Sequence, residues 1–258
     1  MRTQATAIAL GRGHTEAALV ADEGGLGIPF ASNEAALELL ADAIESAGLV
    51  PGSDVSIAVD AAATEFSEGS SYHFRCEGRT LSADQLIAEY ARWVRDYPIL
   101  SIEDPLAEDD WAGWVTATAK LRDDIDLVGD DLFVTQRARL ERGIAEKAAN
   151  SILIKVNQNG LVSRTQSVLG AAKTAGYRTI VSARSGETED AWLADLAVGW
   201  NAQQIKVGST HRSERTAKWN RLLQLEATTQ TRLASPWSDA RRSEQHRFEQ
   251  RATASKTH

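Results

Sequence analysis

Residues 99–132 read ILSIEDPLAEDDWAGWVTATAKLRDDIDLVGDDL, and this stretch decides the fold class. The apolar run at 99–102 is typical of a buried strand, and it ends at Glu103. Residues 110–120 have the composition of a helix, and 125–128 form a second strand-like run that ends at Gly129 and Asp130. A strand, a helix and a strand in this order predict a parallel βαβ unit with a carboxylate after each strand.

The same alternation extends in both directions along the chain. Further strands are predicted at residues 55–59, 151–154, 179–181 and 204–205, and further helices at 33–47, 82–95, 135–147, 162–175, 188–198 and 213–227. Ser82 is the predicted N-cap of the helix at 82–95, because its hydroxyl can accept a hydrogen bond from a free backbone N–H. About six β-then-α units predict an α/β fold with a parallel sheet.

Length, net charge, cysteine content and apolar runs exclude several classes of protein. The 258 residues suffice for one large domain, and the net charge of −8 disfavours nucleic acid as a partner, which needs a clustered basic surface. Cys76 is the single cysteine, so an internal disulfide is impossible and a reducing compartment fits. No apolar run approaches the roughly 18 residues of a membrane helix. We therefore expect a soluble, cytoplasmic protein with no membrane partner.

Five polar residues directly follow predicted strands: Asp60, Glu103, Asp130, Lys155 and Lys206. Any one alone reads as an ordinary loop residue, but five in register suggest the active face that the C-terminal strand ends of a barrel form. Three converging carboxylates repel one another unless a cation neutralises them, and oxygen ligands without histidine or cysteine suit Mg²⁺ rather than Zn²⁺. The alternative is three ordinary surface acids.

The two lysines suggest proton abstraction. A lysine buried beside another positive charge gives up its own proton readily and can then act as a base. Next to a metal that stabilises a developing enolate, such a lysine can remove a proton α to a carboxylate.

Seven short segments, in consistent order, resemble the enolase family. They are DEGG at 22–25, SIEDP at 101–105, VGDDL at 128–132, LIKVNQ at 153–158, SGETED at 185–190, QIKVG at 204–208 and RSER at 212–215. The resemblance implies an incomplete TIM-like (β/α) barrel, that of an enolase C-terminal domain, at residues 21–227. An N-terminal segment, 1–20, would precede it. The tail at 228–258 is rich in Ser, Thr, Gln and Arg, and we expect it to be disordered.

The resemblance also implies a reaction: the Mg²⁺-dependent interconversion of 2-phosphoglycerate and phosphoenolpyruvate in glycolysis. The implied Mg²⁺ ligands are Asp60, Glu103 and Asp130, of which the last two also border the substrate. Lys155 corresponds to the base that removes the C2 proton, and Lys206 to the cation beside the substrate carboxylate.

The remaining implied roles fall on three residues. Glu23 corresponds to the acid that helps the 3-hydroxyl group leave. Arg184 and Ser185 correspond to phosphate binders, since a guanidinium fork suits phosphate oxygens. The competing interpretation of Glu23 and Arg184 is a structural salt bridge.

The chain departs from the family pattern in three respects. Ala183 stands where the family has a histidine, and a methyl group can neither donate a hydrogen bond nor carry charge. The resemblance begins at the DEGG segment, so we expect the family's N-terminal domain, its closing loop and the first barrel strands to be missing. Open sheet edges would then favour pairing with a second copy or with a complementing N-terminal polypeptide.

Three hypotheses remain open. The first is an enolase-like lyase, expected to be much less active than a complete enolase. The second is a related enzyme of phosphonate metabolism, similar to carboxyphosphonoenolpyruvate synthase, for which Ala183 would reflect a changed substrate. The third is a catalytically inactive homologue.

Overall fold

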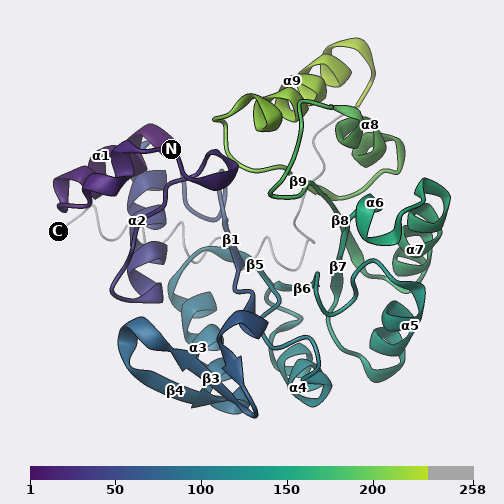
Figure 1. Ribbon diagram of the computed structural model, residues 1–258, viewed down its shortest axis with the longest axis horizontal. Helices are drawn as coiled ribbons and strands as arrows, with labels where there is room; N and C mark the ends of the chain where they lie inside the picture. The colour runs from purple at the N-terminus through teal and green to yellow at the C-terminus, as the bar shows by residue number, and fades with distance from the viewer. Residues whose placement is uncertain (232–258) are drawn as a thin grey trace. The chain divides into compact units, whose positions relative to one another are not determined.

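A computed structural model describes residues 1–231 of the chain (Figure 1). It divides into two compact units. The first contains Met1–Ala18 and Ile28–Val128, and the second contains Leu19–Gly27 and the described residues from Gly129 onward.

The first unit contains three parallel strands, β1 (Ile57–Asp60), β5 (Ile99–Glu103) and β6 (Asp126–Gly129), with β5 in the middle. Its helices are α1 (Arg2–Gly11), α2 (Asn33–Ser46), α3 (Ala83–Asp96) and α4 (Trp111–Leu121). Every residue of β5 is buried, as expected for a strand with a neighbour on each side. The register pairs Asp60 with Glu103 and Glu103 with Val128.

A small antiparallel sheet lies between β1 and α3 in the sequence, and the sequence analysis missed it. It consists of β2 (Ser67–Glu68), β3 (Ser71–Phe74) and β4 (Arg79–Ser82). Strand β3 alternates half-buried and buried residues, and Phe74 stacks on Trp93 of α3 with ring centroids 6.4 Å apart. The short, polar strands gave no apolar run to recognise.

Helix α1 was also not predicted. It buries Ala5 and Ala9, and Ala9 joins a small core cluster with Ala17 and Leu39 of α2. Alanine-rich sequence favours a helix intrinsically, but α1 buries only these two small residues, so its apolar stripe is faint.

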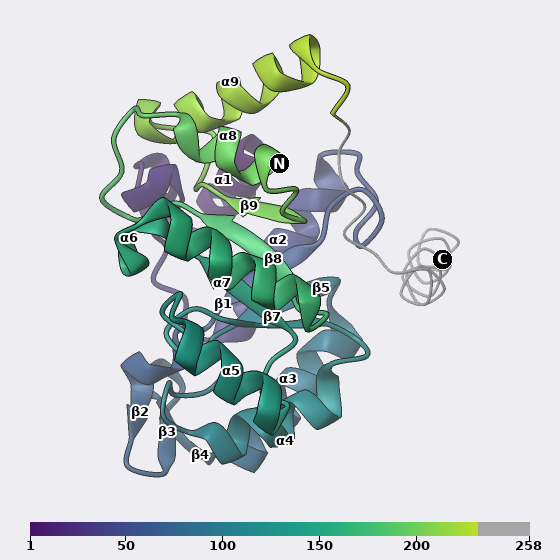
Figure 2. The same cartoon turned by 90° about the vertical axis from the view of Figure 1, so that its right-hand side faces the viewer.

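The second unit also contains three parallel strands, β7 (Ser151–Ile154), β8 (Arg178–Ser182) and β9 (Gln204–Lys206), with β8 in the middle. Its helices are α5 (Arg137–Glu146), α6 (Val156–Asn159), α7 (Val162–Thr174), α8 (Trp192–Gly199) and α9 (Ser213–Thr228). Helix α7 runs beside β7 and β8, as Figures 1 and 2 both show. Strands β7 and β8 are almost wholly buried.

The predicted fold class is confirmed. The described residues hold parallel strands that alternate with helices, three such strands in each unit, which is an α/β fold of the incomplete TIM-barrel kind. Ser82 caps α3 as predicted, and Gln85 completes a capping box. The predicted tail lies outside the described residues from residue 232 onward. Within residues 1–231, no helix combines the length and apolar character needed to span a bilayer.

Candidate metal and substrate site

The first unit brings two predicted ligands to the ends of adjacent strands. Asp60 ends β1 and is exposed, whereas Glu103 ends β5 and is only 6% exposed. The two are direct register partners, after an irregularity between Ile57 and Ala58 that shifts the pairing near the start of β1. The backbone continues the pairing one residue further, where the Ala61 N–H donates to the Glu103 carbonyl at 2.9 Å.

Asp104 follows Glu103 and is a buried acid that the sequence analysis did not assign to the site. Its backbone has a φ of 40°, which costs energy in a non-glycine residue. Its N–H donates to the Val128 carbonyl at 2.9 Å and its carbonyl accepts from the Ala63 N–H at 3.0 Å. These bonds fix the strained residue at the end of β5.

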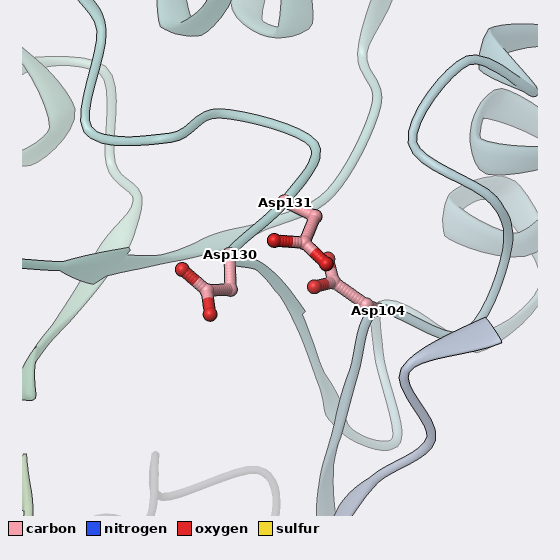
Figure 3. A group of neighbouring side chains, drawn as sticks. All are labelled: Asp104, Asp130 and Asp131. Carbon is pink, nitrogen blue, oxygen red and sulfur yellow. The ribbon is translucent and has the colours of Figure 1, made fainter. Parts of the chain in front are cut away.

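The carboxylates of Asp104, Asp130 and Asp131 form a close group (Figure 3). One oxygen from each lies within 4.8 Å of the others. A backbone hydrogen bond brings these acids together: the Asp104 N–H donates to the Val128 carbonyl, and the two other acids follow Val128 by two and three residues. Three hard oxygen donors so close together suit a divalent cation, so the donor set fits a metal.

Lys155, the predicted base, lies beside Asp130, a predicted metal ligand. It directly follows β7, and its Nζ forms an ion pair with Asp130 Oδ2. The side chains are only 13% and 10% exposed, so water screens the pair weakly. Gln158 of α6 donates to the other carboxylate oxygen, Oδ1, at 3.0 Å.

Thr135 is hydrogen-bonded to Lys155 and to Gln158, the two residues that contact Asp130, and its role was not predicted from the sequence. Its Oγ1 accepts from the Lys155 backbone N–H at 3.0 Å and donates to Gln158 Oε1 at 2.7 Å. The residue is fully buried and has a φ of 51°, unusual for a β-branched side chain. A threonine after a strand gives no signal of this role without the fold.

Glu23 lies on a tight turn that packs against the segment following β9. Its φ is 57°, and its carbonyl accepts from the Ser209 N–H at 2.8 Å. A Cβ at Gly208, whose φ is 92°, would sit only 3.0 Å from that carbonyl oxygen, so a side chain there would push the turn away. Lys206, half-buried at the end of β9, lies two residues before Gly208.

The segment after β8 carries the two predicted phosphate binders. Arg184 and Ser185 are exposed, and the residue before them, Ala183, is 7% exposed. The Ala183 N–H donates to the Lys206 carbonyl at 2.9 Å, which ties the start of this segment to the end of β9. The second unit therefore places Ala183, Lys206 and the Glu23 turn along neighbouring backbone segments.

Each unit thus assembles part of the predicted set. The first unit pairs Asp60 with Glu103, and the second pairs Asp130 with Lys155 and sets the Glu23 turn beside the chain that follows Lys206. The assignment of individual roles to these residues stays a prediction.

Comparison with known families gives a match over most of the chain. The family described as "Enolase, C-terminal TIM barrel domain" matches residues 4–235 of the chain.

Proposed function

Because the chain belongs to the enolase family, we propose that it is an enolase-like lyase that interconverts 2-phosphoglycerate and phosphoenolpyruvate. The observation that supports this most directly is the Lys155–Asp130 ion pair at the ends of β7 and β6. It joins a candidate base to a candidate metal ligand in a poorly hydrated setting. We further propose that the reaction is the glycolytic one and takes place in the cytoplasm.

The proposed elimination begins at C2 of the substrate. The neutral amine of Lys155 takes the C2 proton on Nζ, and the electron pair of the C2–H bond moves toward the carboxylate. The ammonium group of Lys206 lies beside that carboxylate and offsets the charge that develops on it. The electron pair then forms the C2–C3 double bond as the C3–O bond breaks. Glu23 donates a proton to the departing hydroxyl group, so that water leaves.

Two groups of residues hold the substrate and the metal in this proposal. Arg184 and Ser185 bind the phosphate, whose oxygens match the planar guanidinium fork. Asp60, Glu103 and Asp130 bind Mg²⁺, with Asp104 and Asp131 adjacent to the last two. When bound, Mg²⁺ supplies positive charge that stabilises the enolate oxygens of the substrate.

A second candidate function follows from Ala183. A methyl group stands where the family has a histidine, immediately before the proposed phosphate binders. An enzyme acting on a phosphonate analogue, similar to carboxyphosphonoenolpyruvate synthase, would need a differently lined site at this position.

The purified chain with Mg²⁺ and 2-phosphoglycerate tests the first proposal, with phosphoenolpyruvate followed by its ultraviolet absorbance. Lys155→Ala should abolish the signal, because Lys155 is the proposed acceptor of the C2 proton. Lys173→Ala is the control, since Lys173 binds the carbonyls of Trp200 and Asn201 instead. Turnover in Lys155→Ala equal to that of the wild type would refute the assignment of the base. A folded chain that binds phosphonate analogues but forms no phosphoenolpyruvate would favour the second candidate.

A further inference from the structure

Helix α9 buries two cations that the proposed mechanism does not use. Arg215 is 1% exposed and Lys218 is fully buried. Removing an ion from water is unfavourable unless its donors are well matched, so such residues are rare in a protein interior. Both side chains donate to backbone carbonyls of the segment after β8, which contains Arg184 and Ser185, and Lys218 Nζ also donates to the Glu214 carbonyl within α9.

Arg215 holds that segment by its backbone. Its Nη1 donates to the Arg184 carbonyl at 2.8 Å, and its Nη2 donates to the Ser185 carbonyl at 2.5 Å. Nη1 also lies 3.4 Å from the Val207 carbonyl, next to Lys206. One planar guanidinium therefore connects the proposed phosphate binders to the strand end that carries Lys206.

Lys218 holds the same segment further along. Its Nζ donates to the Thr188 carbonyl at 2.5 Å and pairs with Glu187 Oε2 at 2.9 Å. The other carboxylate oxygen of Glu187 accepts from the Arg184 N–H at 2.9 Å. Arg184 is thus fixed through its N–H by the Glu187–Lys218 pair and through its carbonyl by Arg215.

The segment has little else to hold it. Residues 184–190 form no helix or strand, and all of them except Glu187 are exposed. An exposed segment without regular structure samples many conformations, and each one lost on binding weakens the affinity for a ligand. Cations placed behind the segment reduce this cost before any ligand arrives.

We propose that Arg215 and Lys218 are positioning residues that hold the backbone of Arg184 and Ser185 in the conformation that binds a phosphoryl group. The inference rests on the proposed function for the identity of the ligand. Neither cation touches the substrate; both act through the backbone and through Glu187.

Arg215→Lys separates positioning from charge, because it keeps the positive charge but cannot bind two carbonyls as a fork. We expect it to weaken phosphoenolpyruvate binding about tenfold, measured by calorimetry with Mg²⁺, and to raise KM more than it lowers kcat. Arg221→Lys is the matched control on the same helix. Arg221 makes a forked pair with Asp195 of α8 rather than with the segment, so its replacement should leave affinity unchanged.

Lys218→Met removes the second attachment while filling the same space. Hydrogen exchange of the Arg184 amide, measured without ligand, should become at least tenfold faster than in the wild type. Lys173→Met is the control, since Lys173 also binds two carbonyls but at the end of α8. If either α9 variant does not fold, Glu187→Gln tests the same attachment from a partly exposed position, with the same expected exchange.

The outcomes separate this inference from the proposed function. If the wild type neither binds nor forms phosphoenolpyruvate, the proposed function fails, and exchange at Arg184 still decides whether the cations position the segment. If the folded variants show wild-type exchange and wild-type affinity, or if the two controls lose as much, the positioning role is wrong.

Discussion

Thr135→Val should loosen the proposed base without touching it. The replacement keeps the shape of a β-branched side chain and therefore keeps the backbone strain of a residue whose φ is 51°. It removes Oγ1, the acceptor of the Lys155 N–H at 3.0 Å and the donor to Gln158 Oε1 at 2.7 Å. Thr135 is fully buried, so water cannot take the place of the hydroxyl.

The expected cost follows from these two bonds. A buried N–H left without an acceptor costs about 1–3 kcal/mol, and the lost bond to Gln158 adds about 1 kcal/mol. We expect the free energy of unfolding to fall by about 2–4 kcal/mol, measured by urea denaturation. Because small displacements of a reacting group reduce rates steeply, kcat for phosphoenolpyruvate formation should fall about tenfold or more.

Thr135→Ser is the matched control. It keeps the hydroxyl and loses one methyl group, which is worth about 0.8 kcal/mol, so the hydrogen bonds account for the difference between the two variants once this methyl contribution is added back. The reasoning fails if Thr135→Val and Thr135→Ser differ by less than about 0.5 kcal/mol and have the same kcat.

Three further predictions concern the metal, the pH dependence of stability and the substrate. Glu103→Gln should weaken Mg²⁺ binding at least tenfold in calorimetry, because the metal loses a charged ligand. Glu141→Gln on α5 is the control. If Asp104→Asn weakens Mg²⁺ binding but Glu103→Gln does not, the metal binds to the group in Figure 3 instead. The hydrogen bonds from Arg92 lower the pKa of Glu34 in the folded protein below its ordinary 4.5. The pair therefore stabilises the fold fully above pH 4.5, and this stabilisation is lost as the pH falls through the lowered pKa of the folded state. Glu34→Gln should therefore cost about 1 kcal/mol at pH 7, with the difference from wild type vanishing in acid melts, and a difference independent of pH would contradict this. Ala183→His should raise kcat about tenfold if the site acts on 2-phosphoglycerate, since one useful hydrogen bond is worth about 1.4 kcal/mol, whereas no rise in a folded variant would favour another substrate.

The sequence predicted the parallel strands well, because buried strands such as β5 and β7 consist mostly of apolar residues. It failed for β2 to β4, whose pairing depends on turns rather than on apolar runs. A signal was present there: Gly69 and Ser70 connect β2 to β3, a pair typical of tight hairpins, and Gly69 has a φ of 62°.

The site was predictable only as far as strand ends define it. Asp60 and Glu103 are adjacent because each ends a strand of the same parallel pair. Their direct pairing also depends on the register shift between Ile57 and Ala58, which the apolar runs do not indicate. Arg215 and Lys218 could not be found in the same way, since charged residues on a helix ordinarily face water. Their role depends on contacts with residues about 30 positions earlier in the chain, which only the folded structure brings together.

The charges at the site connect Lys155 to the proposed metal. The group of Asp104, Asp130 and Asp131 carries three negative charges when ionised, and so does the set implied by the family resemblance, Asp60, Glu103 and Asp130. The Lys155 ammonium, paired with Asp130, offsets one of these charges, and a divalent cation would offset the other two. In either set Asp130 is the shared member. When Lys155 is neutral, as a base must be, the three carboxylates and a divalent cation together carry one net negative charge. Transfer of the C2 proton to Lys155 makes the sum of these charges zero. Asp130 therefore connects the proton acceptor to the metal, and its replacement should impair both metal binding and proton transfer.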